Sequence, residues 1–523
     1  MKSVLNINKQ LVLLFLIIGS IGLFFRLYHI EFGLPHSFHA DEPEITEPAI
    51  KYTYEFFNII RNNDWYKLIP VSFVYGTFPV YFFTVFTMAF SKSLNILNVP
   101  FDKTSIFIFL RIVNSTVSFL IVPIGTLLYY KLFKDKLGAL ISALFLAFNW
   151  KLIVLSHYVN NDTILTLLTL LCVLMLFKYY EKGRDTKFTV LSGIFFGLAL
   201  GTKITALMSL PAFALPFVLK KDYKSLLGFL LISFGAFAAS NPFSVILVGD
   251  FKNRIIEMLF REGGLVFDSA DYSVTKYISA LAGLTTTGVF LASMFGGVLA
   301  IKKYNNKTTL ILILNIIIYL IFFTIQSRKI DRWIIPVLPF IIIFSSYFFS
   351  WIIHSLKPYH KLKIATVTLF FGIILSHYFY FTLLLLSQYQ KDTPKSAAYL
   401  WMKDKVEITD TVLAITEEGL DPMNKIPGST VIQFNVYEAD SAQYSYPPDA
   451  NLFKYIVIAS KPMSYYKNEV VKQKYPIYFK RWNEFEISLF NSKDFEMIKE
   501  FTLTKPNLTN LSDVYIFKNL NAL

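Results

Sequence analysis

The chain has 523 residues, of which 54% are hydrophobic and 17% aromatic, and its mean hydropathy is +0.49. Charged residues make up only 16%, a share well below that of typical soluble domains, so the composition excludes an ordinary soluble protein and predicts a polytopic α-helical membrane protein. The net charge of +14 arises within residues 1–387, where 34 Lys and Arg face 19 Asp and Glu. This distribution indicates membrane topology rather than nucleic-acid binding. The single cysteine, Cys172, excludes a disulfide within the chain.

Eleven stretches are apolar enough to cross a bilayer as helices of about 20 residues. In chain order they are 11–28, 106–130, 138–156, 163–180, 188–202, 204–219, 226–247, 277–301, 309–326, 333–353 and 363–387. The first lacks a small-residue cleavage site and is followed directly by the charged sequence HADEPE. We therefore interpret it as an uncleaved span rather than a signal peptide.

One further apolar stretch, residues 71–90, decides the topology. If it does not cross, the N-terminus and five later segments face the cytoplasm, and together they carry 18 Lys and Arg against four Asp and Glu. If it crosses, five basic segments face outward, against the positive-inside rule. We therefore predict that 71–90, which Gly76 and Pro79 interrupt, is a juxtamembrane or re-entrant helix in an outer loop over 29–105. The expected plasma-membrane protein has a cytoplasmic N-terminus.

Residues 388–523 have a different composition, with 16 Lys and Arg against 17 Asp and Glu. The sequence DTPKSAAYLWMKDKV predicts a helix that begins at an Asp or Thr cap with Pro in its first turn. TVLAIT, STVIQFNVY, YIVIAS and VYIFKN are rich in β-branched and aromatic residues, as strands are. We expect a small extracytoplasmic α/β domain here, following a membrane domain of residues 1–387.

The predicted topology gathers charged residues from five outer loops on one face of the membrane. The first loop contains FHADEPEITEP, in which four carboxylates lie within seven residues. In chain order the outer loops contribute Asp41, Glu42, Glu44 and Glu47, then His157 and Asp162, then Lys203, then Asp268 and Asp271, and finally Arg328, Lys329 and Arg332.

An acidic pair together with cations at the membrane boundary suits a transferase. A carboxylate beside a like charge, as Asp41 is beside Glu42, is expected to have its pKa raised toward the range of a general base. Lysine and arginine bind phosphate, and the planar guanidinium can do so through two hydrogen bonds. A base and phosphate-binding cations at this boundary indicate group transfer from a lipid phosphate to an acceptor outside the cell.

Each of these residues also has a simpler interpretation. An acidic loop after a first span is commonly only a solvated loop. Asp162 is equally suited to cap the helix that follows it, Lys203 to extend toward the interface, and Arg332 to anchor a span. A lone histidine such as His157 is more often structural than catalytic. The functional interpretation therefore depends on these residues lying together.

Six motifs carry a resemblance to a known family. They are HADEPEITEPAIKY, YGTFPVYFF, FLRIVNSTVSFLIVPIGTLLYYKLF, SHYVNNDTILTLLTLL, GLALGTKITALMSLPAF and RWIIPVLPF. Their order and spacing over residues 10–350 resemble those of GT-C fold glycosyltransferases. The nearest branch is glycosyltransferase family 39 with its bacterial relatives, the protein O-mannosyltransferases and the lipid A aminoarabinose transferase. DTPKSAAYLW also resembles the start of the outer domain in bacterial members.

The resemblance implies a GT-C fold and an inverting transfer of a hexosyl or pentosyl group from a polyprenyl-phosphate-sugar donor to an envelope lipid, glycan or protein. The resemblance implies that Asp41 is the general base and that Glu42, its neighbour, orients the acceptor or tunes Asp41. It implies that Lys203 and Arg332 bind the donor phosphate, with Arg328 and Arg111 as further candidates. Asp162 is implied to lie in the second shell of the site or to contact the acceptor. His157 is a further substrate-binding candidate. No cofactor is required, because Lys and Arg can stabilise a phosphate leaving group. A divalent metal near Asp41 and Asp162, as in related oligosaccharyltransferases, stays an alternative.

Two other classes of function stay open on the sequence. One is a transporter or flippase of lipid-linked glycans, and the other is a non-enzymatic envelope assembly protein. Transporters tend to show internal repeats and broken helices with polar residues at mid-membrane. This sequence shows no evident repeat, and its polar residues gather at the outer ends of the predicted spans. The pattern therefore favours the enzyme.

Overall fold

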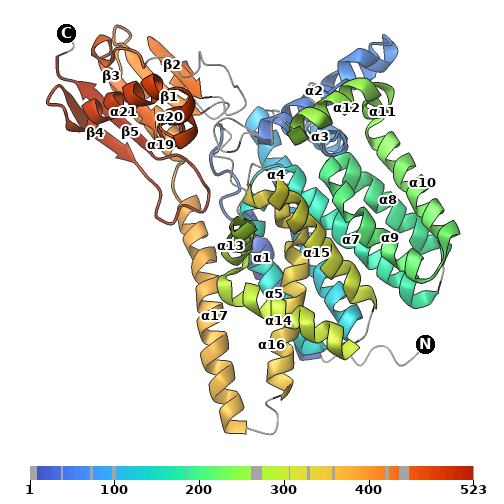
Figure 1. Ribbon diagram of the computed structural model, residues 1–523. Coiled ribbons are helices and arrows are strands. Elements are labelled where there is room, and N and C mark those ends of the chain that lie inside the picture. Colours follow the sequence, from blue (N-terminus) through green and yellow to red (C-terminus); the bar gives the residue numbers. More distant parts are fainter. Residues whose placement is uncertain are drawn as a thin grey trace.

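The computed structural model of the chain describes residues 9–36, 39, 41–70, 73, 75–96, 102–183, 185–260, 274–304, 307–326, 330–355, 360–417, 423–434 and 447–521. These residues form a helical bundle, from which the long helix α17 leads to a C-terminal domain built on a sheet (Figure 1). The mostly helical architecture with a small C-terminal sheet domain confirms the fold class predicted from the sequence.

The helices of the bundle follow one another with short connections. In chain order they are α1 (Lys9–Leu27), α2 (Asp41–Arg61), η1 (Trp65–Leu68), α3 (Phe78–Ile96), α4 (Lys103–Phe133), α5 (Lys136–Ala147), α6 (Trp150–Ser156), α7 (Asn161–Lys182), α8 (Thr186–Thr202), η2 (Ile204–Ser209), α9 (Leu210–Leu219), α10 (Tyr223–Ser240), α11 (Pro242–Ile246), α12 (Val248–Phe260), α13 (Val274–Thr285), α14 (Thr287–Tyr304), α15 (Lys307–Ile325), η4 (Asp331–Val337), α16 (Leu338–Ser355) and α17 (His360–Tyr389).

Each of the eleven predicted spans contains helix, but the spans differ in length and continuity. Within the described residues, six helices are long and apolar enough to cross a bilayer, or up to eight if each bent pair of helices counts as one span. The predicted span 138–156 is broken between α5 and α6 by a bend of 50°, and 277–301 is broken between α13 and α14 by a bend of 108°. The count of eleven crossings therefore stays a prediction. α3, in the stretch expected not to cross, is not among the six.

The breaks follow from local capping residues. Asn149 accepts a hydrogen bond from the backbone N–H of Leu152, which starts α6 inside an apolar run that contains neither Gly nor Pro at the break. Asp135 caps α5 in the same way, accepting from the N–H groups of Leu137 and Gly138. At the second break, Thr286 has a positive φ of 73°, a backbone conformation that ends α13.

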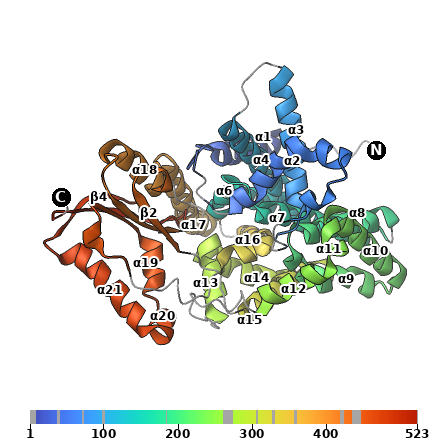
Figure 2. The same ribbon diagram turned by 90° about the horizontal axis from the view of Figure 1, so that it is seen from above.

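The two ends of the bundle differ: basic turns lie at one end, and short helices lie at the other. Lys134 pairs with Glu181 at 3.7 Å, and Tyr179 donates to Asp222 at 2.8 Å, so the ends of α4 and α7 and the start of α10 lie together. These helix ends lie at the lower end of the bundle in Figure 1. These contacts join turns that the sequence marks as basic. At the upper end lie α2, α3, α11 and α12, beside the C-terminal domain (Figures 1 and 2). The short helices therefore cover the end of the bundle opposite the basic turns.

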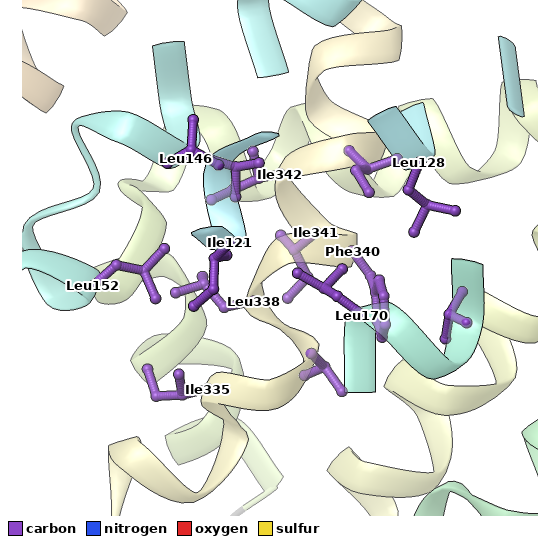
Figure 3. Close-up of a cluster of buried hydrophobic side chains, with 14 of the residues drawn as sticks. Ile121, Leu128, Leu146, Leu152, Leu170, Ile335, Leu338, Phe340, Ile341 and Ile342 are labelled. Carbon is purple, nitrogen blue, oxygen red and sulfur yellow. The ribbon is translucent and has the colours of Figure 1, made fainter. Parts of the chain in front are cut away.

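The core of the bundle is an apolar cluster centred on α16. Figure 3 shows Leu338, Phe340, Ile341 and Ile342 of α16 among side chains from α4, α5, α6 and α7, which include Ile121, Leu128, Leu146, Leu152 and Leu170. In Figure 3 Ile335 of η4 lies at the edge of this cluster, and it is fully buried. Because η4 packs into the core, the residues at its start are held in a fixed place at the upper end.

The C-terminal domain has a five-stranded sheet in the order β2-β1-β3-β5-β4. Its elements are α18 (Pro394–Lys405), β1 (Val412–Glu417), η5 (Met423–Lys425), β2 (Ser429–Phe434), η7 (Ala450–Leu452), β3 (Tyr455–Ala459), α19 (Ser460–Tyr466), α20 (Glu469–Lys474), α21 (Pro476–Asn491), β4 (Phe495–Phe501) and β5 (Val514–Asn519). Strands β1, β2 and β3 are parallel, whereas β5 is antiparallel to β3 and β4. The predicted helix and four predicted strands are confirmed; β4 was not predicted.

Candidate active site

The loop after α1 is fixed by a buried ion pair. The guanidinium of Arg111, in α4, donates from Nε and Nη2 to the two carboxylate oxygens of Glu42 at 2.7 Å each. Its Nη1 donates to the backbone oxygens of Ile30 and Phe32 at 2.8 Å. Glu42 also accepts from the N–H of Val159 at 3.2 Å, and neither charged side chain is exposed. This pair therefore ties the loop and the start of α2 to α4 and to the segment before α7.

His157 also holds the loop after α1, through a contact with the backbone of Tyr28. Its Nε2 lies 2.8 Å from the backbone oxygen of Tyr28 and its Nδ1 lies 2.8 Å from that of Ile153. The ring stacks on Tyr389 with centroids 4.1 Å apart. Burial lowers the pKa of His157 to about 4, although both backbone oxygens act in the opposite direction. His157 is thus a buried neutral side chain that joins α1, α6 and α17.

These fastenings place Asp41 against Arg332, a residue 291 positions later in the chain. The Asp41 carboxylate forms an ion pair with the Arg332 guanidinium, in which Nη1 contacts Oδ2 and Nη2 lies 3.4 Å from Oδ1. The two side chains are 15% and 16% exposed, so both reach the surface of the site. Burial raises the pKa of Asp41, but Arg332, His39 and Lys203 together hold it well below its ordinary value. The sequence predicts a raised pKa for Asp41, and this prediction is wrong. Arg332 is distant from Asp41 in the sequence, so its effect on the carboxylate was not predicted.

His39 lies between the acidic and the basic partner. Its Nδ1 accepts a hydrogen bond from the backbone N–H of Asp41 at 3.2 Å, and its Nε2 lies 3.5 Å from Nη1 of Arg332. The ring stacks on Tyr158 with centroids 4.1 Å apart and an interplanar angle of 12°. Burial, with Arg332 and Lys151 adding to it, lowers the pKa of His39 to about 4. At neutral pH His39 is therefore uncharged.

A second ion pair joins the start of α7 to the end of α8. Lys203 ends α8 in an extended conformation (φ −158°, ψ 123°), and its Nζ donates to Oδ1 of Asp162 at 2.9 Å. Both are largely buried. The helix cap of α7 is Asn160, which accepts from the N–H of Thr163 at 2.9 Å. Asp162 is thus not the cap, and its carboxylate is directed to Lys203.

The segment before α3 packs against the end of α8, next to Lys203. A side chain at Gly76 would meet the backbone oxygen of Gly201 at 1.8 Å, so only glycine fits this close approach. The N–H of Gly76 donates to the backbone oxygen of Thr202 at 3.2 Å, and that of Thr77 donates to Asn241 at 2.6 Å. The YGT sequence is therefore bound to the end of α8, beside Lys203.

The two ion pairs belong to one electrostatic cluster. Asp41 interacts with Lys203 as well as with Arg332, and Arg332 interacts with Asp162 and with the tyrosines Tyr75 and Tyr158. Burial raises the pKa of Tyr158 well above its ordinary value, with Asp41 and Asp162 also raising it. Two acids and two bases from four distant parts of the chain therefore lie within electrostatic reach of one another.

A third ion pair beside this cluster was not predicted. Lys151, at the start of α6, donates from Nζ to Oδ2 of Asp331 at 2.9 Å. Asp331 precedes Arg332 in η4, and Lys151 also acts on His39. Lys151 was not a predicted site residue, because it lies inside the predicted span 138–156. The break between α5 and α6 at Asn149 places Lys151 at the upper end of the bundle.

Two family models of membrane mannosyltransferases match separate parts of the chain. The first, described as dolichyl-phosphate-mannose-protein mannosyltransferase, matches residues 102–247. The second, described as the Alg9-like mannosyltransferase family, matches residues 274–391. No curated protein matches the sequence. The matched segments contain Asp162, Lys203 and Arg332.

Solved structures of two membrane proteins share the fold. ArnT from Cupriavidus metallidurans, bound to undecaprenyl phosphate, matches with a TM-score of 0.55 and 12% identity over 97% of this chain and 98% of that chain. The oligosaccharyltransferase of Archaeoglobus fulgidus, in complex with Zn and sulfate, matches with a TM-score of 0.50 and 15% identity over 85% of this chain and 68% of that chain. At such identities the likeness shows a common fold.

The chain is a membrane glycosyltransferase of the GT-C fold. The family matches favour this enzyme class over the transporter and the assembly protein that the sequence left open. The predicted site residues of this GT-C glycosyltransferase divide into two groups. Asp41, Arg332, Asp162 and Lys203 form the charged cluster, whereas Glu42, Arg111 and His157 are buried and hold the loop that carries Asp41. Arg328, Lys329, Asp268 and Asp271 lie outside the described residues.

A divalent metal is not suited to the described side chains of this site. Within the described ranges, no group of three or more His, Cys, Asp or Glu is placed to hold a metal ion. Each carboxylate of the cluster also faces a cation, Arg332 for Asp41 and Lys203 for Asp162. A divalent ion prefers oxygen ligands without competing ammonium or guanidinium groups. We therefore derive no step through a metal.

Proposed function

We propose that this GT-C enzyme transfers a sugar from a polyprenyl-phosphate-sugar donor to an envelope acceptor at the outer face of the plasma membrane. The observation that carries the proposal is the contact of Asp41 with Arg332 beside the Asp162–Lys203 pair. It combines a carboxylate with two cations that suit a phosphate monoanion or dianion. The lipid carrier bound by ArnT, undecaprenyl phosphate, supports a donor of the same class.

The outer-face location is supported by the distribution of charge. The cluster lies at the end of the bundle opposite the turns joined by Lys134–Glu181 and Tyr179–Asp222. Those turns belong to the basic segments that the positive-inside rule assigns to the cytoplasm. The same assignment makes the N-terminus cytoplasmic and the C-terminal domain extracytoplasmic.

The donor phosphate would take the place that the Asp41 carboxylate holds on Arg332. Arg332 and Lys203 are the cations directed into the cluster, and a phosphate between them would be held by charge-assisted hydrogen bonds. His39 adds a further donor, because its Nδ1 accepts from the Asp41 N–H and its proton must then lie on Nε2. This Nε2 lies 3.5 Å from Nη1 of Arg332, so both N–H groups can reach one phosphate oxygen.

Displacement of Arg332 from Asp41 would create the general base. Arg332 is the strongest influence holding the pKa of Asp41 below its ordinary value, and burial acts the other way. With Arg332 engaged by phosphate, Asp41 becomes a stronger base. An acceptor hydroxyl then attacks the anomeric carbon, its proton passes to Asp41, and the bond from carbon to phosphate oxygen breaks. Polyprenyl phosphate leaves as an anion on Arg332 and Lys203, and this single displacement inverts the anomeric centre.

The test compares two carboxylates of α2. In cells that lack the gene, we expect the D41N variant to leave the envelope acceptor unmodified and the donor lipid accumulated, as seen by mass spectrometry of glycans and lipids. General base catalysis supplies about 10²–10⁴ in rate, so the loss should be at least of that order. The control is E47Q, because Glu47 is exposed and pairs with the surface residue Lys103 at 2.7 Å. Restoration of the modification by D41N at the wild-type level, with equal expression, would refute the proposal.

A further inference from the structure

The start of η4, which carries Arg332, depends on contacts from other helices. Ile330, the residue before η4, has an apolar side chain, which offers no oxygen to the free N–H groups of a helix start. Ile330 and Asp331 are partly exposed, whereas Ile334 and Ile335 further along η4 are fully buried. Arg332 therefore lies between the packed part of η4 and a start that the core does not enclose.

Tyr277, in α13, binds the backbone just before η4. Its hydroxyl accepts from the N–H of Ile330 at 3.2 Å and donates to the backbone oxygen of the same residue at 3.4 Å. Its ring is buried and lies near Phe323, which also contacts Trp333 of η4. One hydroxyl group thus holds both backbone polar groups of the residue from which η4 begins.

Lys151, in α6, binds the first residue of η4. Its Nζ donates to Oδ2 of Asp331 at 2.9 Å, and the Asp331 carboxylate also interacts with the backbone of Arg332. The Lys151 side chain is 13% exposed and that of Asp331 is 44% exposed. An ion pair this open to solvent adds little to stability. Its effect is therefore to fix where Asp331 and the adjacent backbone lie.

The two helices that hold the start of η4 are also joined to each other. Asn149, the cap of α6, donates from Nδ2 to the backbone oxygen of Leu284 in α13 at 2.8 Å. Trp150, the first residue of α6, donates from Nε1 to the backbone oxygen of Gly283 at 3.2 Å. The elements α6, α13 and η4 are thus bonded in pairs, which fixes their relative positions.

We propose that Tyr277 and Lys151 are positioning residues for Arg332. In the proposed function, on which this inference rests, the Arg332 guanidinium exchanges the Asp41 carboxylate for the donor phosphate. A backbone held on both sides of Arg332 lets the side chain alone make this exchange, so little ordering is lost when the phosphate binds. One positioning residue acts through the backbone before η4 and the other through a carboxylate of η4, so both affect the donor through Arg332.

A direct contact of Lys151 with the donor phosphate is the alternative, because Lys151 lies near enough to the charged cluster to influence His39. The two possibilities predict opposite effects when Asp331 is removed. If Lys151 binds phosphate itself, loss of its carboxylate partner frees the cation and removes a negative charge, so phosphate binds more tightly. If Lys151 acts through Asp331, the same loss weakens binding.

The experiment measures equilibrium binding of undecaprenyl phosphate to the purified full chain in detergent. We expect Y277F, K151M and D331A each to weaken binding about threefold to tenfold, as the loss of one or two hydrogen bonds would. The double variant K151M/D331A should bind no more weakly than either single variant, because both substitutions break one contact. K151R, which keeps the charge, should bind within about twofold of the wild type.

Matched controls come from the opposite end of the bundle. Y129F removes a tyrosine hydroxyl that donates to Asp135 at 2.9 Å, and K134M breaks the partly exposed ion pair with Glu181 at 3.7 Å. Both controls should bind undecaprenyl phosphate as the wild type does. Y277F and K151M should have melting temperatures close to those of their respective controls.

The contrary results identify which proposal fails. Unchanged or tighter binding in D331A would overturn the positioning role of Lys151, and unchanged binding in Y277F would overturn that of Tyr277. Melting temperatures well below those of the controls, with weak binding that K151R does not restore, would make these contacts structural. If R332M, in which both positioning residues are intact, binds undecaprenyl phosphate normally, the proposed phosphate site itself is wrong.

Discussion

Glu42 and Arg111 form a bidentate ion pair that is closed to solvent, with both carboxylate oxygens 2.7 Å from guanidinium nitrogens. Asp41, one residue earlier, faces the charged cluster and is partly exposed. Adjacent acids in the HADEP sequence thus have opposite surroundings. Glu42 lies in the first turn of α2, accepts from the N–H of Val159 and pairs with Arg111, which in turn binds the backbone oxygen of Ile30. Glu42 therefore positions Asp41 while its own side chain is closed to solvent.

Substitution of Glu42 should therefore reduce stability before it affects chemistry. The E42Q variant leaves the Arg111 charge buried without its partner, and we expect a loss of about 3–5 kcal/mol in the free energy of unfolding. D41N should lower the unfolding temperature less than E42Q does, because Asp41 and Arg332 are 15% and 16% exposed, whereas Glu42 and Arg111 are closed to solvent. Thermal unfolding in detergent, followed by the intrinsic fluorescence, distinguishes the two. An E42Q protein with wild-type stability and no transfer would instead assign a catalytic role to Glu42.

The Asp162–Lys203 pair allows a test of charge pairing apart from donor binding. Either K203M or D162N alone leaves a charge in a site where the partners are 10% and 3% exposed, so each should be destabilised by about 3–5 kcal/mol. The double variant D162N/K203M removes both charges and should recover most of that stability, since the two substitutions are coupled. We expect the recovered protein to remain inactive, because Lys203 is lost as a phosphate ligand. Recovery of transfer together with stability would exclude Lys203 from the site.

His39 should give the protein a measurable dependence on pH. Burial lowers the pKa of His39 from 6.5 to about 4 in the folded state, so the unfolded chain binds the extra proton between these values. Stability should therefore fall as the pH falls from 6.5 to 4, by at most about 1.4 kcal/mol per pH unit from this group. The H39Q variant should lack this contribution while His157 keeps its own. Equal slopes of melting temperature against pH in H39Q and wild type would contradict the buried neutral state of His39.

Much of the site could be predicted because the ends of apolar spans are evident in a sequence. Asp162, Lys203 and Arg332 each lie at such an end and Asp41 lies in the loop after the first span, so a topology that places these ends together also places the residues together. The sequence does not reveal which neighbour is buried. Glu42 and Arg111 were therefore interpreted as site residues, although they hold the loop, and the effect of Arg332 on the pKa of Asp41 was missed.

The elements that were not predicted have a common physical cause: the local sequence pattern does not show the contacts that determine their structure. Lys151 was hidden because the run 138–156 appears continuous, whereas Asn149 caps a second helix within it. Strand β4 was hidden because its sequence, FEMIKEF, alternates poorly, carries three charges and lies at the sheet edge with an irregularity between Met497 and Lys499.

The orientation of the chain in the membrane is open to a direct test with two exposed lysines. Lys134 follows α4 at the end joined to Glu181, and Lys391 follows α17 near Gln390, whose side chain donates to Tyr28 at 2.6 Å. The two positions thus lie at opposite ends of the bundle. In a C172S background, which removes the one cysteine, a membrane-impermeant maleimide should label K391C on intact cells and K134C only after permeabilisation. Labelling of K134C from outside would place the charged cluster in the cytoplasm, where an acceptor of the outer envelope could not reach Asp41.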